Sequence, residues 1–189
     1  MLTSTALTSP MDTDTDILGA GLVLEQISPT LWEMHDVFHE EYLAYLDRYV
    51  DDSNIWVMDR AASRISSPVD NSSKPFDAAG RALLSIIRPH LPVPVQFGFA
   101  KMFLDFAGSS VPMHTDGPSI AVMAQIYLTA GDFTLPGTVF MDPMLHTVKF
   151  RRNHGYINLN TDAKNHMSPK LSTGVRISLA LQYQHQRPK

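Results

Sequence analysis

The segment "VPMHTDGPSI", residues 111–120, places a histidine and an aspartate two positions apart in a short apolar stretch with turn-forming residues on both sides. In an extended strand, residues i and i+2 point to the same face of the sheet. The imidazole of His114 and the carboxylate of Asp116 would then be directed at one point. What lies there depends on the rest of the chain.

Short strands are predicted on both sides of this segment. Apolar runs suited to strands follow "HLPVP" (90–94), and their separators, such as "FAGSSVP" (106–112) and "TAGDFTLPG" (129–137), carry turn residues. An earlier strand is expected within 17–27. The later strands are expected near 95–106, 120–128, 138–140, 145–151, 155–160 and 174–184.

Two helices are predicted before most of these strands. An amphipathic pattern covers residues 28–50, and a second covers 74–89. The polar segment between them, 51–73, is expected to be a long loop, which with Trp56 and Arg64 could cover a substrate. Helices followed by many strands indicate an α+β, mainly β chain, whose sheets form a sandwich or barrel with helices on one side.

The composition limits the class of protein. A chain of 189 residues with 44% hydrophobic residues fits one domain, expected over 17–189 after a flexible leader at 1–16. No apolar run is long enough for a transmembrane helix, and the N-terminus does not resemble a secretory signal, so a cytoplasmic location is expected. The net charge of −4 argues against nucleic-acid binding, despite the local basic run "KFRRNH" (149–154).

The chain contains no cysteine. This excludes disulfides, zinc fingers, iron–sulfur clusters and thiol nucleophiles. A metal ion would therefore be held by histidine, aspartate or glutamate side chains.

His166 is the histidine that best completes a site with His114 and Asp116. It precedes a nearly apolar strand, "VRISLALQY" (175–183), in which Arg176 is the one charged residue. A buried arginine needs an anionic partner, and no carboxylate of the chain is obviously matched to it, so a carboxylate-bearing ligand is expected. His146 is interpreted as a strand-face residue and His154 as a turn residue.

Two imidazoles and one carboxylate form the facial triad that is typical of non-haem Fe(II) oxygenases. With His166 located 52 positions after His114 and an arginine ten positions later, the chain resembles the 2-oxoglutarate/Fe(II)-dependent dioxygenase superfamily. The resemblance covers about residues 95–184, and includes "GTVF" (137–140) and the Arg-x-Ser element at Arg176 and Ser178.

The resemblance implies a fold, a set of ligands and roles for individual residues. The fold would be a double-stranded β-helix, a cupin-like jelly roll, supported by the two N-terminal helices. His114, Asp116 and His166 would bind Fe(II), while Arg176 and Ser178 would hold the distal carboxylate of the co-substrate 2-oxoglutarate. O2 would be the oxidant, with ascorbate as a supporting reductant.

Three further residues are candidates for co-substrate binding. Lys101 lies on the strand before the His-x-Asp motif, although a surface lysine is the favoured interpretation. Gln125 and Tyr127 share one face of the following strand and are directed either toward the ligand or, for Tyr127, into the core.

The predicted activity is hydroxylation of a C–H bond with release of succinate and CO2. Asp116 favours hydroxylation, because related halogenases lack this carboxylate. The substrate would be an amino acid, a small metabolite or a peptidyl residue, and neither nucleic acid nor a membrane is an expected partner. The competing interpretation is a non-catalytic, cupin-like module that binds a metal or small ligand without turnover.

Overall fold

The computed structural model describes residues 17–51, 57–59, 64–67, 74–129, 136–141, 145–160 and 166–186. The leader predicted for residues 1–16 lies outside the described residues. So does most of the loop predicted for 51–73.

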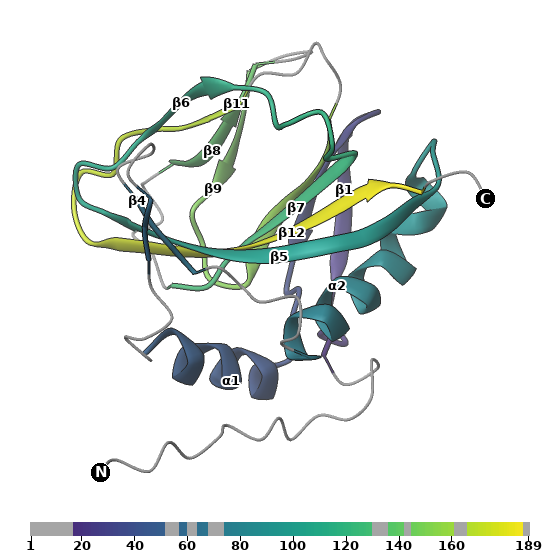
Figure 1. The fold of residues 1–189 in the computed structure, drawn as a ribbon, viewed down its shortest axis with the longest axis horizontal. Helices are drawn as coiled ribbons and strands as arrows, with labels where there is room; N and C mark the ends of the chain where they lie inside the picture. The colour runs from purple at the N-terminus through teal and green to yellow at the C-terminus, as the bar shows by residue number, and fades with distance from the viewer. Residues whose placement is uncertain are drawn as a thin grey trace.

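Two antiparallel sheets form the described fold (Figure 1). The larger has eight strands in the order β1-β2-β10-β7-β12-β5-β4-β3, and the smaller has four in the order β6-β11-β8-β9. The larger sheet contains β1 (Val23–Ser28), β2 (Leu31–His35), β10 (His154–Leu159), β7 (Val122–Tyr127), β12 (Val175–His185), β5 (Val95–Phe106), β4 (Arg64–Ser67) and β3 (Val57–Asp59). The smaller contains β6 (Val111–His114), β11 (His166–Ser168), β8 (Pro136–Phe140) and β9 (His146–Lys149).

The helices cover the outer face of the larger sheet, and the smaller sheet covers its inner face (Figure 1). The helices are α1 (Glu40–Val50), α2 (Lys74–Ile87) and the short 3₁₀ helix η3 (Arg88–His90). None of the helices in the described part of the chain is long and apolar enough to cross a membrane.

Side-chain alternation along β12 explains how one strand serves both layers. Ile177, Leu179, Leu181 and Tyr183 belong to the core beneath the helices. Ala180, on the opposite face, belongs to a second core between the two sheets, together with Leu31, Met123, Tyr127, Phe140, Val148, Phe150 and Tyr156. The polar residues of the inner face are therefore placed between the sheets.

The predicted architecture is confirmed as mainly β, with two antiparallel sheets and helices on one side. The strands predicted from residue 95 onward agree with β5, β7, β8, β9, β10 and β12 within a few residues. β6 and β11 are not among the strands predicted from periodicity, since they contain four and three residues and carry little periodic signal. The extended geometry expected at both His114 and Asp116 ends with β6 at His114, and Asp116 lies beyond the strand.

The helix predicted over 28–50 is wrong in its first part. Residues Leu31–His35 form β2, which pairs with both β1 and β10, and the helix begins at Glu40. Leu31 and Glu33 face the smaller sheet, while Trp32 and Met34 join the core beneath the helices. The alternation has period two over this stretch, so burial on both faces favours a strand.

Part of the predicted 51–73 loop also forms strands. β3 and β4 extend the larger sheet, and β4 pairs with β5 through Ile65↔Leu104 and Ser66↔Phe103. Pairing at this edge brings Arg64 next to the inner face of β5.

Candidate metal centre

The smaller sheet brings His114 and His166 together. His114 ends β6 and His166 begins β11, and the two residues are direct partners in the antiparallel register. Their ring centroids are 4.3 Å apart. Asp116 follows β6 by two residues, and one ligand atom from each of the three side chains lies within 4.8 Å of the others.

The two imidazoles are held in forms suited to metal binding. His114 Nδ1 lies 2.9 Å from the carbonyl oxygen of Pro112, so Nδ1 is the donor and Nε2 keeps its lone pair. Burial lowers the pKa of His166 to about 4, with the positive charge of His114 acting in the same direction. His166 is therefore neutral near pH 7, and a neutral imidazole is the form that binds a metal.

The carboxylate of Asp116 completes the set. Burial raises the pKa of Asp116, although the charge of His114 acts to lower it. Asp116 Oδ2 is buried and has no hydrogen-bond partner among the described residues, and His166 Nε2 lies 4.0 Å from Asp116 Oδ1. Because an unpaired buried polar atom costs about 1–3 kcal/mol, the Asp116 oxygen indicates a partner that the protein itself does not supply. A divalent cation fits this donor set.

A small pocket of about 100 Å³ opens beside the triad. Gln125 reaches it from β7, and its amide is fixed on both sides: Tyr156 Oη donates to Gln125 Oε1 at 2.7 Å, and Gln125 Nε2 donates to Ser178 Oγ at 2.8 Å. The lining side chains are Arg64, Phe103, Val111, His114, Asp116, Met123, Gln125, Tyr156, His166, Ser168 and Gln182.

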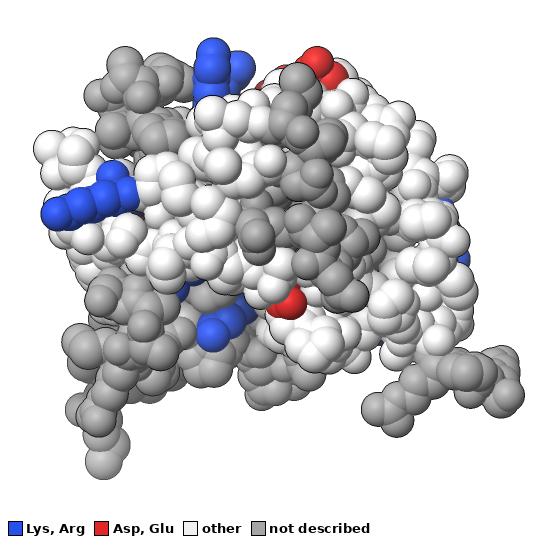
Figure 2. All heavy atoms as spheres, turned by 90° about the horizontal axis from the view of Figure 1, so that it is seen from above, with Lys and Arg blue, Asp and Glu red and all other residues white. Residues whose placement is uncertain are grey.

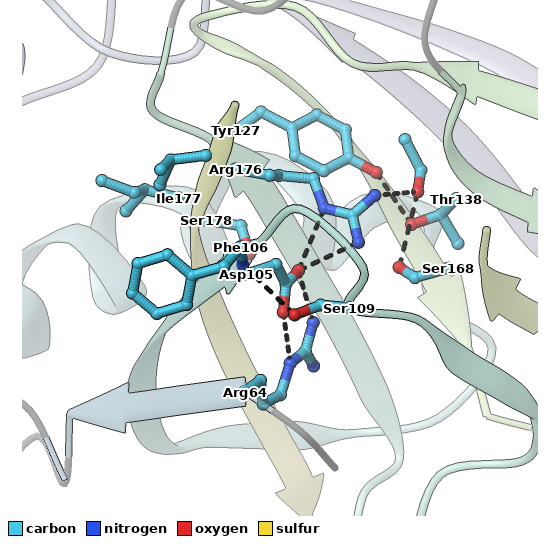
Figure 3. Close-up of polar contacts among 12 residues, drawn as sticks. Arg64, Asp105, Phe106, Ser109, Tyr127, Thr138, Ser168, Arg176, Ile177 and Ser178 are labelled. Atoms are coloured by element: carbon cyan, nitrogen blue, oxygen red, sulfur yellow. Dashed lines mark hydrogen bonds and ion pairs between the residues drawn. The ribbon is translucent and has the colours of Figure 1, made fainter. Parts of the chain in front are cut away.

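Arg176 does not line this pocket, and it contacts a carboxylate of the chain (Figure 3). Its Nε donates to Asp105 Oδ2 at 3.0 Å, and its Nη1 donates to the carbonyl oxygen of Gly137 at 3.1 Å. The expectation that no carboxylate of the chain is matched to Arg176 was therefore wrong. Arg176 Nη2 is 2.9 Å from Asp105 Oδ2 as an ion pair, yet it has no hydrogen bond within the described residues.

Arg64 is the guanidinium that reaches the pocket. Its Nε and Nη2 donate to the two oxygens of Asp105 at 2.7 and 2.8 Å, and its Cζ lies 4.2 Å from the ring centroid of Phe103. Figure 3 shows Asp105 between the side chains of Arg64 and Arg176. Burial acts to raise the pKa of Asp105, but hydrogen bonds and charges from both arginines outweigh it and lower this pKa.

This arrangement places two guanidinium groups around one carboxylate, which leaves one excess positive charge next to the pocket. Arg64 was expected on a loop over a substrate, whereas it belongs to β4. Asp105 was missed. Its signal in the sequence is that it is an acidic residue on the same strand face as Phe103, directly before a turn.

The other predicted co-substrate residues do not line the pocket. Ser178 contacts it indirectly, through Gln125. Tyr127 is buried and its hydroxyl lies 2.8 Å from Thr138 Oγ1, and burial raises the pKa of Tyr127 to about 12. Lys101 has its Nζ 5.3 Å from the ring centroid of Phe103.

The described surface carries few clustered charges on the face seen in Figure 2, where basic side chains lie apart from one another. A continuous basic stripe, which a nucleic-acid-binding face would require, is not present among the described residues of this face.

Neither family sequence models nor curated protein sequences match the chain. Solved structures do match it. A prolyl-4-hydroxylase from Pseudomonas putida superposes with a TM-score of 0.67 at 15% identity, covering 84% of this chain and 94% of that one. The chain has the fold of the 2-oxoglutarate/Fe(II) oxygenases.

Two further oxygenase structures show the same likeness. A prolyl hydroxylase from Trichoplax adhaerens, solved with a peptide fragment of hypoxia inducible factor, has a TM-score of 0.67 at 9% identity and covers 84% of each chain. HygX from Streptomyces hygroscopicus, solved with nickel, 2-oxoglutarate and hygromycin B, has a TM-score of 0.66 at 13% identity and covers 83% of each chain. The double-stranded β-helix predicted for this chain is thereby confirmed.

Proposed function

We propose that the chain is an Fe(II)- and 2-oxoglutarate-dependent oxygenase that hydroxylates a C–H bond and releases succinate and CO2. The observation that carries this proposal is the convergence of His114, Asp116 and His166 beside a pocket, on an oxygenase fold. The buried, unpartnered Oδ2 of Asp116 supports a bound cation at this point.

In this proposal His114, Asp116 and His166, which line the pocket, would hold Fe(II) there. The metal, together with 2-oxoglutarate and O2, supplies the oxidising chemistry that side chains lack. The protein contributes orientation. The Pro112 carbonyl fixes the ring of His114, and burial keeps His166 unprotonated.

Arg176 and Ser178 remain the proposed anchors for the distal carboxylate of 2-oxoglutarate, and Arg64 is added to them. The excess positive charge around Asp105 favours a second anion. Gln125, held by Tyr156 and Ser178, presents a fixed amide to a ligand in the pocket. Tyr127 and Lys101 are proposed only as neighbours that shape this region.

We propose a peptidyl residue or a small molecule as the substrate. The similar structures include prolyl hydroxylases, one of them solved with a peptide, and an enzyme solved with hygromycin B. Proline-containing peptides are therefore the first substrates to screen, followed by free amino acids and small metabolites.

The test is succinate formation from 2-oxoglutarate by the purified protein with Fe(II), O2 and ascorbate across this substrate screen. His114→Ala, Asp116→Ala and His166→Ala should each abolish succinate formation and weaken Fe(II) binding, without unfolding the domain. Asp116→Gly should lose hydroxylation but keep residual metal affinity, because both imidazoles remain.

His185→Ala is the matched control, since His185 is exposed at the end of β12 and lies outside the pocket. It should keep full activity. Stoichiometric metal binding without succinate formation on any substrate would favour the non-catalytic binding module instead. Retention of turnover in His166→Ala would remove His166 from the site.

A further inference from the structure

A second group of histidine and glutamate side chains lies outside the proposed catalytic centre. Glu33 and His35 come from β2 and His154 from β10, and one ligand atom from each lies within 4.8 Å of the others. His35 and His154 are direct partners in the β2–β10 register, with ring centroids 4.4 Å apart. The interpretation of His154 as a turn residue was wrong, because it is the first residue of β10 and is buried. The proposed oxygenase activity does not use these three residues.

A fourth side chain reaches the group from the other sheet. His146, on β9, places its Nε2 2.5 Å from Glu33 Oε1, while His154 Nε2 lies 2.9 Å from Glu33 Oε2. Burial acts to raise the pKa of Glu33, but hydrogen bonds and charge from the two histidines outweigh it and lower this pKa. Glu33 is therefore an anion that already contacts two imidazoles from different sheets, that of His146 and that of His154.

One nitrogen of the group is buried and unused. His154 is 5% exposed, and its Nδ1 has no hydrogen-bond partner among the residues that the structure describes. Since Nε2 donates to Glu33, Nδ1 carries the lone pair. His154 therefore has a buried nitrogen that the protein leaves without a partner, on a residue whose ligand atom lies within 4.8 Å of those of Glu33 and His35, and a cation bound by the group would satisfy it.

We propose that Glu33, His35, His146 and His154 form a second divalent-cation site, of the imidazole-rich type that binds Zn²⁺. Three imidazoles and one carboxylate match the ligands and coordination number of zinc. Zinc ligands at 2.0–2.2 Å lie about 3.3 Å apart, so the ligand atoms of Glu33, His35 and His154, which lie within 4.8 Å of one another, need to shift by only about 1 Å. His146 would join them by a larger movement of its side chain.

The placement of the site suggests how it would act. The side chains of His35 and His146 are 31% and 25% exposed, which gives an ion access from solvent, whereas that of His154 is 6% exposed. Glu25 lies 3.7 Å from His35 Nε2 and adds negative charge at the rim. A bound ion would fasten β9 of the smaller sheet to β2 and β10 of the larger one.

The test uses Zn²⁺ alone and the full chain with the catalytic centre disabled by Asp116→Ala and His166→Ala. Zinc content after equilibrium dialysis should be one equivalent in this background and two in the unaltered protein. Co²⁺ in the same background should give the intense visible absorption of a four-coordinate site. Addition of Zn²⁺ should also raise the melting temperature.

His35→Ala combined with His154→Gln should lower Zn²⁺ affinity in the disabled background by more than about 100-fold, the upper end for losing only an outer-shell partner. His35→Ala alone should also weaken Zn²⁺ binding. Because the side chain of His35 is partly exposed, this variant should keep the fold. His185→Ala, exposed and distant in sequence from the group, should change nothing. The proposal is overturned if the disabled background binds no Zn²⁺ at micromolar concentration, or if the His35 and His154 substitutions leave its affinity unchanged.

Discussion

Asp105→Asn removes the negative charge between Arg64 and Arg176 while keeping the size of the side chain. The side chains of Asp105 and Arg176 are both 1% exposed, so the variant leaves a guanidinium charge buried without its counter-ion. The new amide N–H groups also face guanidinium donors. Loss of one partner of a buried ion pair costs about 3–5 kcal/mol of unfolding free energy.

Urea unfolding followed by circular dichroism measures this cost. With an m-value of about 2 kcal/mol/M, the midpoint should fall by about 2 M. Asp77→Asn is the matched control, because Asp77 pairs with Arg81 at 2.7 Å on the surface of α2, with side chains 34% and 63% exposed. Its cost should be about 0.3–0.5 kcal/mol, the usual value for exposed helical pairs.

The pH dependence provides a second check of the same reasoning. The pKa of Asp105 is lowered in the folded state, so its contribution is present above the unfolded value of about 3.9 and is lost as pH falls through the folded value. The stability difference between the unaltered protein and Asp105→Asn should be constant from about pH 5 to 8 and shrink below about pH 4. Equal destabilisation by Asp105→Asn and Asp77→Asn would refute the argument from burial.

Three further predictions concern the pocket and the strands around it. Arg176→Ala should weaken 2-oxoglutarate binding by about 2–5 kcal/mol, measured by calorimetry, while Fe(II) affinity stays the same, and Arg176→Lys should restore only part of the 2-oxoglutarate affinity. Unchanged 2-oxoglutarate binding in a folded Arg176→Ala variant would remove Arg176 from the site. Gly155→Ala should destabilise the fold by more than the about 1–3 kcal/mol of ordinary overpacking, because the added Cβ would overlap the backbone carbonyl of Gln125. Gly21→Ala is the tolerated control in the same urea assay, since its added Cβ would come no closer than 4.0 Å to another residue. Asn153→Ala should lower the free energy of unfolding by about 2–4 kcal/mol in that assay, because it removes two buried hydrogen bonds to the Phe38 backbone, at 2.8 and 2.9 Å, and a side chain suited to the φ of 59°. A decrease below about 1 kcal/mol would contradict this.

Local sequence patterns were sufficient to predict which face of a strand belongs to which layer of this fold. Alternation along residues 95–106 separates Lys101, Phe103 and Asp105 from Met102 and Leu104, and the structure places these two sets on opposite faces of β5. The same alternation occurs in Leu31–His35, where an aromatic and acidic pattern of nearly helical spacing led to a wrong prediction of helix. Both spacings fit five residues equally well, and only pairing with β1 and β10 decides between them.

Residue types and order were also sufficient to nominate His114, Asp116 and His166, because a His-x-Asp motif followed by a later histidine supplies the two imidazoles and one carboxylate of a facial triad. Their convergence depends on the pairing of two very short strands, His166 with His114, which no local signal predicts.

The partner of Arg176 illustrates what the tertiary structure alone decides. The sequence shows that an arginine in an apolar strand needs an anion, but Asp105 is 71 residues away and becomes its partner through the β5–β12 register, in which the two residues are directly opposed. The Glu33, His35, His146 and His154 group arises in the same way, from strands far apart in the chain. Side-chain period is a local property that a sequence displays, whereas register is set by how all the strands pack together, and so the charges that meet between the sheets are determined only in the folded chain.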